Sequence, residues 1–498
     1  MRMLITTLSI LAVLVMPAWA QKIETQKPDS GRIIHRPATL NHLSVIEASE
    51  PASQAGTRQL MVLSADRTHL VNTITNKPVF MNGEAAWSAI VQLNDSDAEK
   101  YLADRASRGF NIIEVNLLEH AWANNCSSCL YGCADIKGDC PFRGAAFSTP
   151  NEAYFQEADA FLRLASQHGI TVLLDLFDLQ ATVSAGWGAE VQEASDATMT
   201  NWGAYVGHRY RHFDNVIYLM GTDVDPRTTK PPLTRKLAEM AMALHSADPN
   251  HLISAKNGGG KSSLDVFSGT PWLGISEMYG AANVAKLNHE YSRSDFIPFF
   301  MDEDTYENEH SSTPLLVRTR QYWSSLSGAY LGSFLGNSPI WCFNETHTIV
   351  GDIPCRNDLT WQSQLGSKGS VGQMWYGKLM RSREHWKMVP DIKHTVVTAG
   401  YGSGGTLAVT ARTRDGQTII SYIPNGNATT LTVDMSKITS KPSLANCWWF
   451  NPSDGSTTLI GSYANSGNRK FTPPDANDWV LVIDDKDAKL PPPGSADL

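Results

Sequence analysis

The sequence has no sustained run of lysine or arginine, and its formal net charge at pH 7 is −9. Proteins that bind nucleic acid need clustered positive charge to neutralise phosphates, so nucleic acid is not an expected partner. The one basic cluster, formed by Arg381, Arg383 and Lys387, is interrupted by Glu384. This pattern is typical of a solvated helix face.

Long apolar runs are also missing after residue 20, whereas a membrane-spanning helix needs roughly 20 apolar residues. Before that point the chain carries Arg2, an apolar stretch over 4–16, and the small-x-small sequence Ala-Trp-Ala at 18–20. This order predicts a secretory signal peptide over 1–20, followed by a polar leader or linker over 21–58. No cysteine directly follows the apolar stretch to accept a lipid, so we expect export to the periplasm or the extracellular space without a membrane anchor.

The usual signatures of metal and nucleotide sites are absent as well. There is no H-E-x-x-H motif, and the 14 histidines show no ligand spacing, so neither a metal ion nor another cofactor is expected. The segment AKNGGGKSS at 255–263 is similar to a phosphate-binding loop, but Ala255 stands where that loop requires its first glycine. We interpret 255–263 as a flexible loop.

The seven cysteines have to be interpreted in an exported, oxidising setting. Four of them crowd one segment: Cys126, Cys129, Cys133 and Cys140. Their spacing would suit zinc in a cytosolic protein, but after export two local disulfides are the preferred prediction. Cys342 and Cys355 could form a third bridge. Cys447 is then unpaired, and its apolar surroundings in NCWWF predict a buried free thiol.

Between residues 59 and 388, short apolar runs alternate with longer amphipathic stretches. The apolar runs are residues 78–83, 111–118, 170–177, 215–221, 251–255, 272–279, 297–303 and 338–343. Strands buried on both faces have such continuous apolar runs, and a strand–helix unit repeated eight times predicts an α/β fold, the (β/α)8 or TIM barrel. A doubly wound open sheet is the alternative. The barrel is preferred because the run count reaches eight and no glycine fingerprint follows the first run.

From residue 389 to 488 the apolar pattern changes to a period of two. The turn pairs Asp415-Gly416, Asn425-Gly426 and Asp454-Gly455 separate strand-like segments and are strong hairpin signals. We therefore predict a C-terminal antiparallel β-sandwich domain over 389–488. The tail over 489–498 is expected to be disordered.

Two carboxylates follow apolar runs at positions that the barrel would bring together. Asp223 follows the fourth run and Glu303 ends the seventh, and the carboxyl ends of barrel strands surround the active site. Glycosidic hydrolysis needs such a pair, because one group protonates the leaving oxygen while the other attacks the anomeric carbon or activates water. Asp223 could instead cap the next helix, although Asp225 before Pro226 suits that role better. The acidic segment around Glu303 could simply be solvated.

Further aromatic and polar residues follow other apolar runs. They are Glu84, Trp87, Glu119, His120, Trp122, Asp175, Asp178, Glu277, Tyr279 and Trp341. Aromatic rings stack on the C–H faces of sugars, and polar side chains hydrogen-bond to sugar hydroxyls. The set therefore predicts a carbohydrate-binding rim.

Several segments resemble the apiosidase-like glycoside hydrolase barrel, the group that includes glycoside hydrolase family 140. They are VFMNGEAAW and the residues up to 116, VIYLMGTDVDP at 216–226, FMDEDTYE at 300–307, and 318–343. DWVLVID at 478–484 resembles the end of the collagen-binding-type β-domain that often follows this barrel. The usual G-D-T-A-W after the first strand is replaced by Gly-Glu-Ala-Ala-Trp at 83–87.

The resemblance implies roles for individual residues. Asp223 corresponds to the general acid/base and Glu303 to the nucleophile of a retaining enzyme. Tyr306 and Glu307 complete the E-x-x-Y-E pattern, and Tyr306 joins the expected substrate-binding residues. The implied substrate is an apiosyl linkage in pectic side chains.

The expected function is thus a secreted retaining glycoside hydrolase acting on a pectic or related oligo- or polysaccharide. Two alternatives stay open: a non-catalytic carbohydrate- or matrix-binding protein, and an inverting hydrolase of the same fold. The sequence gives no indication of the sugar, its linkage or the oligomeric state.

Overall fold

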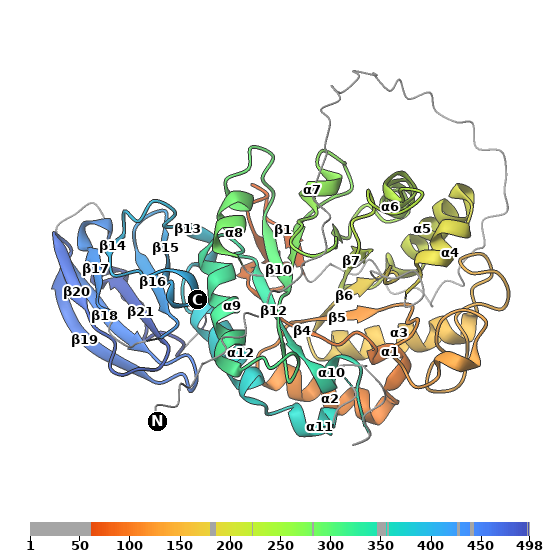
Figure 1. Ribbon diagram of the computed structural model, residues 1–498, viewed down its shortest axis with the longest axis horizontal. Coiled ribbons are helices and arrows are strands. Elements are labelled where there is room, and N and C mark those ends of the chain that lie inside the picture. The colour runs from red at the N-terminus through yellow and green to blue at the C-terminus, as the bar shows by residue number, and fades with distance from the viewer. Residues whose placement is uncertain are drawn as a thin grey trace, which may run out of the picture. The chain divides into compact units, whose positions relative to one another are not determined.

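The computed structural model describes residues 61–179, 186–221, 223–280, 283–345, 355, 358–425, 429–438, 443–495 and 497. The signal peptide and leader predicted over residues 1–58 lie outside the described residues. Figure 1 shows parallel strands surrounded by helices, followed in the chain by a second group of strands coloured blue.

Eight parallel strands form the first group. They are β4 (Met81–Ala85), β5 (Ile112–Asn116), β6 (Thr171–Asp175), β7 (Val216–Met220), β8 (Ile253–Ala255), β9 (Ser276–Tyr279), β10 (Phe299–Glu303) and β12 (Gly332–Asn337). Their order is β8-β7-β6-β5-β4-β12-β10-β9, with the short β11 (Tyr306–Glu307) paired to β12. A parallel bridge between Ile253 and Leu273 brings the two edges of this sheet together. The sheet is therefore a nearly closed barrel, which confirms the predicted α/β TIM-barrel fold.

Helices connect the strands on the outside of the barrel (Figure 1). They are α1 (Ala89–Gln92), α2 (Asp95–Ser107), α3 (Glu152–Gln167), α4 (Gly188–Glu193), α5 (Asp196–Tyr210), α6 (Thr234–Ala247), α7 (Leu264–Phe267), α8 (Val284–Tyr291), α9 (Pro314–Leu326), α10 (Ser338–Trp341), α11 (Trp361–Gln364) and α12 (Lys368–Arg381). Helix α2 begins where the Asn94 side chain accepts a hydrogen bond from the Asp97 backbone N–H, an N-cap. Among the described helices, none combines the length and apolar character needed to cross a membrane.

An apolar layer fills the barrel and closes its amino-terminal end. The antiparallel strands β1 (Met61–Leu63), β2 (Leu70–Asn72) and β3 (Lys77–Val79) precede β4 directly. Met61, Leu70 and Val79 from these strands pack in one cluster with inward-facing barrel residues such as Ile112 and Phe300. Because this end is closed by apolar packing, polar chemistry is confined to the carboxyl ends of the strands.

The eighth strand does not lie where the sequence predicts it. The prediction places it at 338–343, but β12 covers Gly332–Asn337, and Ser338–Trp341 forms the short helix α10. Pro339 cannot donate a ladder hydrogen bond and fits the first turn of a helix instead. The strand itself was missed because two glycines interrupt its apolar pattern.

The second group of strands is a β-sandwich, as predicted. One sheet has the order β13 (Met388–Pro390), β15 (Val409–Thr413), β16 (Thr418–Ile423), β21 (Trp479–Asp485), β18 (Leu444–Phe450) and β19 (Thr457–Ala464). The other has the order β14 (Val397–Ala399), β17 (Leu431–Asp434) and β20 (Asn468–Phe471). The turns at 415–416 and 454–455 join paired strands, as hairpins do. The hairpin predicted at Asn425-Gly426 is wrong, because the strands before and after it, β16 and β17, belong to different sheets.

The sandwich is bound to the barrel through buried ion pairs. Arg318 on α9 makes two hydrogen bonds to Asp478, at 2.9 and 2.8 Å. Arg383, which follows α12, makes two to Asp484, at 2.9 and 2.7 Å. Arg383 is fully buried, so its predicted place on a solvated helix face is wrong. Buried arginine requires a paired carboxylate, and the sequence does not reveal a partner about a hundred residues away.

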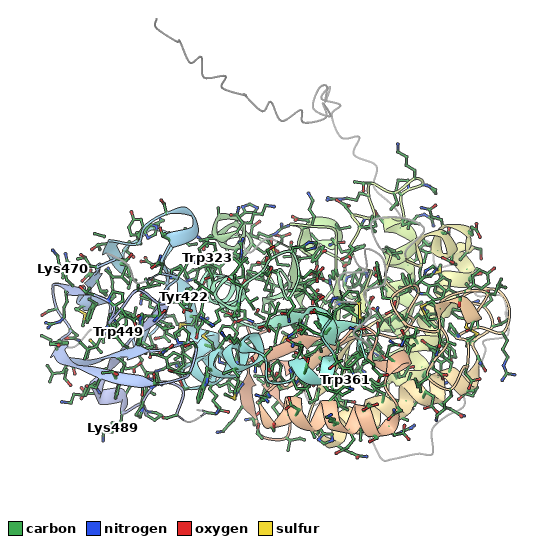
Figure 2. All side chains as sticks on the ribbon, turned by 60° about the horizontal axis from the view of Figure 1, so that its bottom comes forward. Trp323, Trp361, Tyr422, Trp449, Lys470 and Lys489 are labelled. Carbon is green, nitrogen blue, oxygen red and sulfur yellow. A yellow bond between two sulfur atoms is a disulfide. The ribbon has the colours of Figure 1, made fainter. Side chains whose placement is uncertain are left out.

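Aromatic stacking adds to the same contact. Tyr322 on α9 stacks on Tyr422 of β16, with ring centroids 4.5 Å apart and planes 3° from parallel. Trp323 donates to the carbonyl of Leu407 at 2.9 Å, and Figure 2 labels both Trp323 and Tyr422, which belong to one apolar cluster. Helix α9 is therefore shared by the barrel and the sandwich.

The predicted disorder of the C-terminal tail is not what the structure shows for residues 489–495. The carbonyl of Pro491 accepts a hydrogen bond from Arg383 at 3.0 Å. The backbone N–H of Gly494 donates to Ser382 Oγ at 2.9 Å. These contacts fix the tail against the end of α12, and its proline-rich composition does not predict them.

Replacing Arg383 with methionine should lower the free energy of unfolding of the protein substantially. The change leaves the Asp484 carboxylate buried without its cation, which typically costs about 3–5 kcal/mol of unfolding free energy. Denaturant unfolding followed by tryptophan fluorescence measures this loss. Arg235→Met is the control, because the Arg235 side chain is 69% exposed in its ion pair with Glu239 and should change the transition little. Equal effects of the two changes would contradict the structural role of Arg383.

Candidate active site

A cavity of about 350 Å³ lies at the carboxyl ends of the barrel strands. This volume is within the range of ligand pockets, about 300–1,000 Å³. Most of the predicted site residues line it: Trp87, Trp122, Asp178, Asp223, Tyr279, Glu303, Tyr306 and Trp341. Residues that the sequence analysis did not select also line it: Asn116, Lys256, Asp304, Thr305, Glu309 and His310. Asp175 and Glu277 are buried and are not among the lining residues.

Asp223 reaches the cavity from the turn after β7. Its φ angle is +59°, in the left-handed region that costs energy for a residue with a Cβ. Tyr279 hydrogen-bonds to the Asp223 side chain, and burial raises the pKa of this carboxyl. The carboxyl is thus held in a strained turn, and its buried Oδ1 atom has no hydrogen-bond donor among the described residues.

Glu303 is the last residue of β10. The pairing of β10 with β9 shifts register between Met301 and Glu303, and such a bulge redirects side chains at strand ends. Glu303 Oε2 accepts a hydrogen bond from Lys256 Nζ at 2.6 Å. Burial raises the pKa of Glu303 to about 8, although the nearby ammonium acts in the opposite direction.

Lys256 is fully buried and carries the positive charge of the site. Its Nζ atom lies 3.0 Å from Asp302 Oδ2 and 3.7 Å from Glu114 Oε1. It also lies 4.2 Å from the ring centre of Trp87 and 4.9 Å from that of Tyr279. The ammonium is therefore enclosed by carboxyls and aromatic faces, both of which favour the charged form.

Lys256 is not among the site residues predicted from the sequence, although a usable signal is present. Lys256 directly follows β8, the same relation to a strand that selects Asp223 and Glu303. The glycine-rich stretch after it leads to the prediction of a flexible loop. Instead Asn257, Ser262 and Ser263 are buried, and Ser263 Oγ donates to the carbonyl of Ala255 at 2.6 Å.

Aromatic side chains form one wall of the cavity. Trp122 and Trp341 meet edge to face at 5.8 Å, and Trp87 Nε1 donates to the Tyr306 hydroxyl at 3.0 Å. Glu309 hydrogen-bonds to the Trp341 side chain. This wall packs against the disulfide between Cys342 and Cys355.

Three predicted binding residues lie outside this lining. Glu84 pairs with Arg105 at 2.8 Å and accepts from the Tyr101 hydroxyl at 2.7 Å, both on α2. Its neighbours on β4 face the barrel interior, so strand alternation turns Glu84 to the outer face. Glu119 accepts from Ser88 Oγ at 2.8 Å and from the His120 backbone at 2.9 Å.

His120 contacts Glu190 at 3.3 Å, and its ring meets Trp187 edge to face at 5.1 Å. The Glu119 carboxylate also faces the Trp122 backbone N–H at 3.3 Å. We therefore propose that Glu119 and His120 hold the loop that carries Trp122. Glu84, Glu119 and His120 are left out of the proposed set of substrate-binding residues.

The four clustered cysteines pair among themselves, as the sequence predicts, and the structure supplies the connectivity that the sequence leaves open. Cys126 pairs with Cys133, Cys129 with Cys140, and Cys342 with Cys355. Cys447 is a buried free thiol. Across the described ranges, no cluster of His, Cys, Asp and Glu is arranged to hold a metal ion. The first two bridges close the loop that begins beside Trp122.

Comparison with known proteins identifies the family. Residues 64–387 match the family described as "Apiosidase-like, catalytic domain". The chain belongs to this family. Residues 389–484 match the family described as "Putative collagen-binding domain of a collagenase". No functionally curated protein matches the chain.

Solved structures share the fold of this apiosidase-like chain. A glycoside hydrolase family 5 protein from Bacteroides vulgatus ATCC 8482 aligns with a TM-score of 0.73 and 20% identity, over 86% of this chain and 93% of that one. A protein described as a glycoside hydrolase aligns with a TM-score of 0.72 and 21% identity, over 86% of this chain and 97% of that one. These likenesses support the barrel and sandwich architecture.

Glu307, the last residue of the E-x-x-Y-E pattern, has a different environment from Glu303. It accepts hydrogen bonds from Ser367 Oγ at 2.6 Å, from the Gly369 backbone at 2.9 Å and from Asn337 Nδ2 at 3.1 Å. These donors tie the segment after β10 to the start of α12. Glu307 therefore positions this segment of the apiosidase-like barrel and is not one of the cavity-lining residues.

The disulfide pairing can be checked with single serine variants. Cys126→Ser should leave Cys133 as the new reactive thiol, and Cys140→Ser should leave Cys129. Alkylation of the unreduced but denatured proteins exposes the buried Cys133 to the reagent. Tandem mass spectrometry then identifies which cysteine is labelled in addition to the free thiol Cys447. Release of a different thiol, or stoichiometric zinc in the wild-type protein, would show that the loop is organised in another way.

Proposed function

We propose that this protein is a secreted retaining glycoside hydrolase that acts on a pectic or related plant polysaccharide, with Asp223 as general acid/base and Glu303 as nucleophile. One observation carries the proposal: these two carboxyls, from the ends of β7 and β10, line the same aromatic-walled cavity. Hydrolysis of a glycosidic bond requires such a pair on either side of one bond.

The environments of the two carboxyls favour these roles. Glu303 is in direct contact with the Lys256 ammonium, which stabilises the carboxylate form that a nucleophile needs. Asp223 has no cation in hydrogen-bond contact among the described residues, and burial raises its pKa. Burial raises the pKa of both carboxyls, so the direct contact with Lys256 is what distinguishes them. Asp223 lacks this contact, and we assign to it the proton that goes to the leaving oxygen.

The cavity walls favour a sugar substrate. Trp87, Trp122 and Trp341 offer aromatic surface for the C–H faces of a saccharide, while Asn116 and Asp178 offer polar groups for hydroxyls. Membership of the apiosidase-like family supports an apiosyl linkage in a pectic side chain.

Export of the protein is supported by its cysteines. Three disulfides occur within the described residues, and such bonds persist in oxidising compartments such as the periplasm or the extracellular space. The proposed signal peptide over residues 1–20 would direct this export.

Substitution of the two carboxyls should separate their roles. Glu303→Ala removes the group that forms the covalent glycosyl intermediate, so hydrolysis should be lost whatever the leaving group. Asp223→Ala removes acid and base catalysis, worth roughly 10²- to 10⁴-fold, but an activated aryl glycoside needs little acid help. This variant should therefore show a burst on the aryl glycoside, and added azide should accelerate its turnover.

The substrate for this test comes from a screen of pectic and hemicellulosic oligosaccharides, read by the mass of the released sugar. Proton NMR of the first-formed anomer then distinguishes retention from inversion. Cleavage by the wild type with equal loss in both variants, no burst and no azide rescue would refute the assigned roles. Binding without any cleavage would favour a non-catalytic carbohydrate-binding protein.

The pH profile should reflect the buried nucleophile. Attack requires the Glu303 carboxylate, so kcat/KM should rise with pH as this group loses its proton. Because burial raises the pKa of Glu303 to about 8, the rise should occur well above the range of an exposed carboxyl, about 4.3. The two carboxyls interact, so the measured values belong to the pair. A rate that is already maximal and constant from pH 5 would contradict this environment.

A further inference from the structure

The ammonium of Lys256 contacts the proposed nucleophile directly and does more than balance the negative charge of the site. Within the described residues it is the lysine whose ammonium touches the proposed nucleophile, and it does so at 2.6 Å. It is also fully buried, so water does not screen this contact as it would at the surface. Moving an ammonium group out of water costs free energy. Lys256 is nevertheless buried in the wall of the ligand cavity.

The geometry fixes the ammonium on several sides. Asp302 Oδ2 at 3.0 Å and Glu114 Oε1 at 3.7 Å contact it from β10 and β5. The Trp87 and Tyr279 rings face it at 4.2 and 4.9 Å. A cation held from several directions gives the Glu303 carboxyl one preferred orientation, because Oε2 must stay on the donor.

Other ionisable groups around Glu303 act mostly against its ionisation. They belong to several neighbouring strands and connections: Asp223 after β7, Asp302 on β10, Glu114 on β5, Glu277 and Tyr279 on β9, and Tyr306 on β11. Negative charge on any of these groups raises the pKa of Glu303, as burial does, whereas Lys256 lowers it. Lys256 is therefore the principal group that favours the carboxylate.

We propose that Lys256 is a positioning residue for the nucleophile: its ammonium fixes the Glu303 carboxyl through a direct hydrogen bond and favours the carboxylate form that attacks the anomeric carbon. This inference rests on the proposed function, since it assigns Lys256 a purpose only if Glu303 attacks the sugar. Lys256 itself forms no bond to substrate in this scheme.

The proton affinity of Glu303 can be measured without a substrate. In protein labelled with ¹³C at the glutamate carboxyl carbon, NMR follows each carboxyl as the pH changes, and Glu303→Gln identifies the Glu303 signal. Lys256→Met removes the charge while keeping an unbranched side chain, so the Glu303 midpoint should rise by roughly 1 to 3 pH units. Lys256→Arg should restore most of the wild-type value, and Lys100→Met, an exposed position on α2, should not move it.

An unchanged Glu303 midpoint in folded Lys256→Met would overturn the proposal. If that variant does not fold, the wild-type protein still provides a test through ¹⁵N-labelled lysine, with Lys256→Arg identifying the signal. The Lys256 side-chain resonance should move at the same pH as the Glu303 carboxyl. A Lys256 signal that does not respond at that pH would show that the two groups are not coupled.

Hydrolysis gives the second readout. On any glycoside that the wild type cleaves, Lys256→Met should shift the acid limb of kcat/KM to higher pH by the same amount as the Glu303 midpoint, and the loss should shrink as the pH rises. Loss by an equal factor at every pH would indicate a merely structural role. A Glu303 midpoint that depends on Lys256, in a protein that cleaves no glycoside, would contradict the proposed function and leave the coupling intact.

Discussion

The buried ammonium of Lys256 is the interaction on which the site depends. Glu114, Asp302 and Glu303 approach one another from two strands in the barrel interior, where an unpaired carboxylate would cost several kcal/mol. Their approach is tolerable because Lys256, which directly follows β8, lies among them at 2.6 to 3.7 Å. The barrel has to place β5, β8 and β10 correctly for this cluster to form. The same arrangement of these three strands is therefore needed both to close the barrel and to pair the buried charges of the cavity.

The aromatic side of the cavity is held by different means. Its tryptophans lie on connections rather than on strands, and a long connection has no ladder hydrogen bonds to fix it. Disulfides fulfil that function: two close the loop that follows Trp122, and the third adjoins Trp341. Glu119 adds hydrogen bonds to the backbone before Trp122. The aromatic wall therefore relies on disulfides, which persist in oxidising compartments.

The sequence predicts the barrel and the two carboxyls because both depend on local pattern: buried strands are apolar, and functional groups follow their carboxyl ends. Prediction from the sequence fails where the position of a side chain depends on the register of a strand or on a partner far along the chain. Glu84 lies one residue from inward-facing positions, yet alternation turns it to Arg105. Arg383 finds Asp484 far along the chain. Lys256 is not predicted because the glycines after it suggest a flexible loop, whereas buried hydrogen bonds from Asn257 and Ser263 hold that loop in place.

Helix α9 connects the sandwich to the wall of the cavity. The segment between Glu303 and Thr313 carries Tyr306 and Glu309 into the cavity wall, and α9 begins at the end of this segment, where Thr313 caps its first turn. Five residues after Thr313, Arg318 is bound by Asp478 of the sandwich. Helix α9 therefore packs against both the barrel and the sandwich, and the contacts with the sandwich help to set one end of the cavity-lining segment. The β-domain therefore supports the helix that follows this part of the cavity wall.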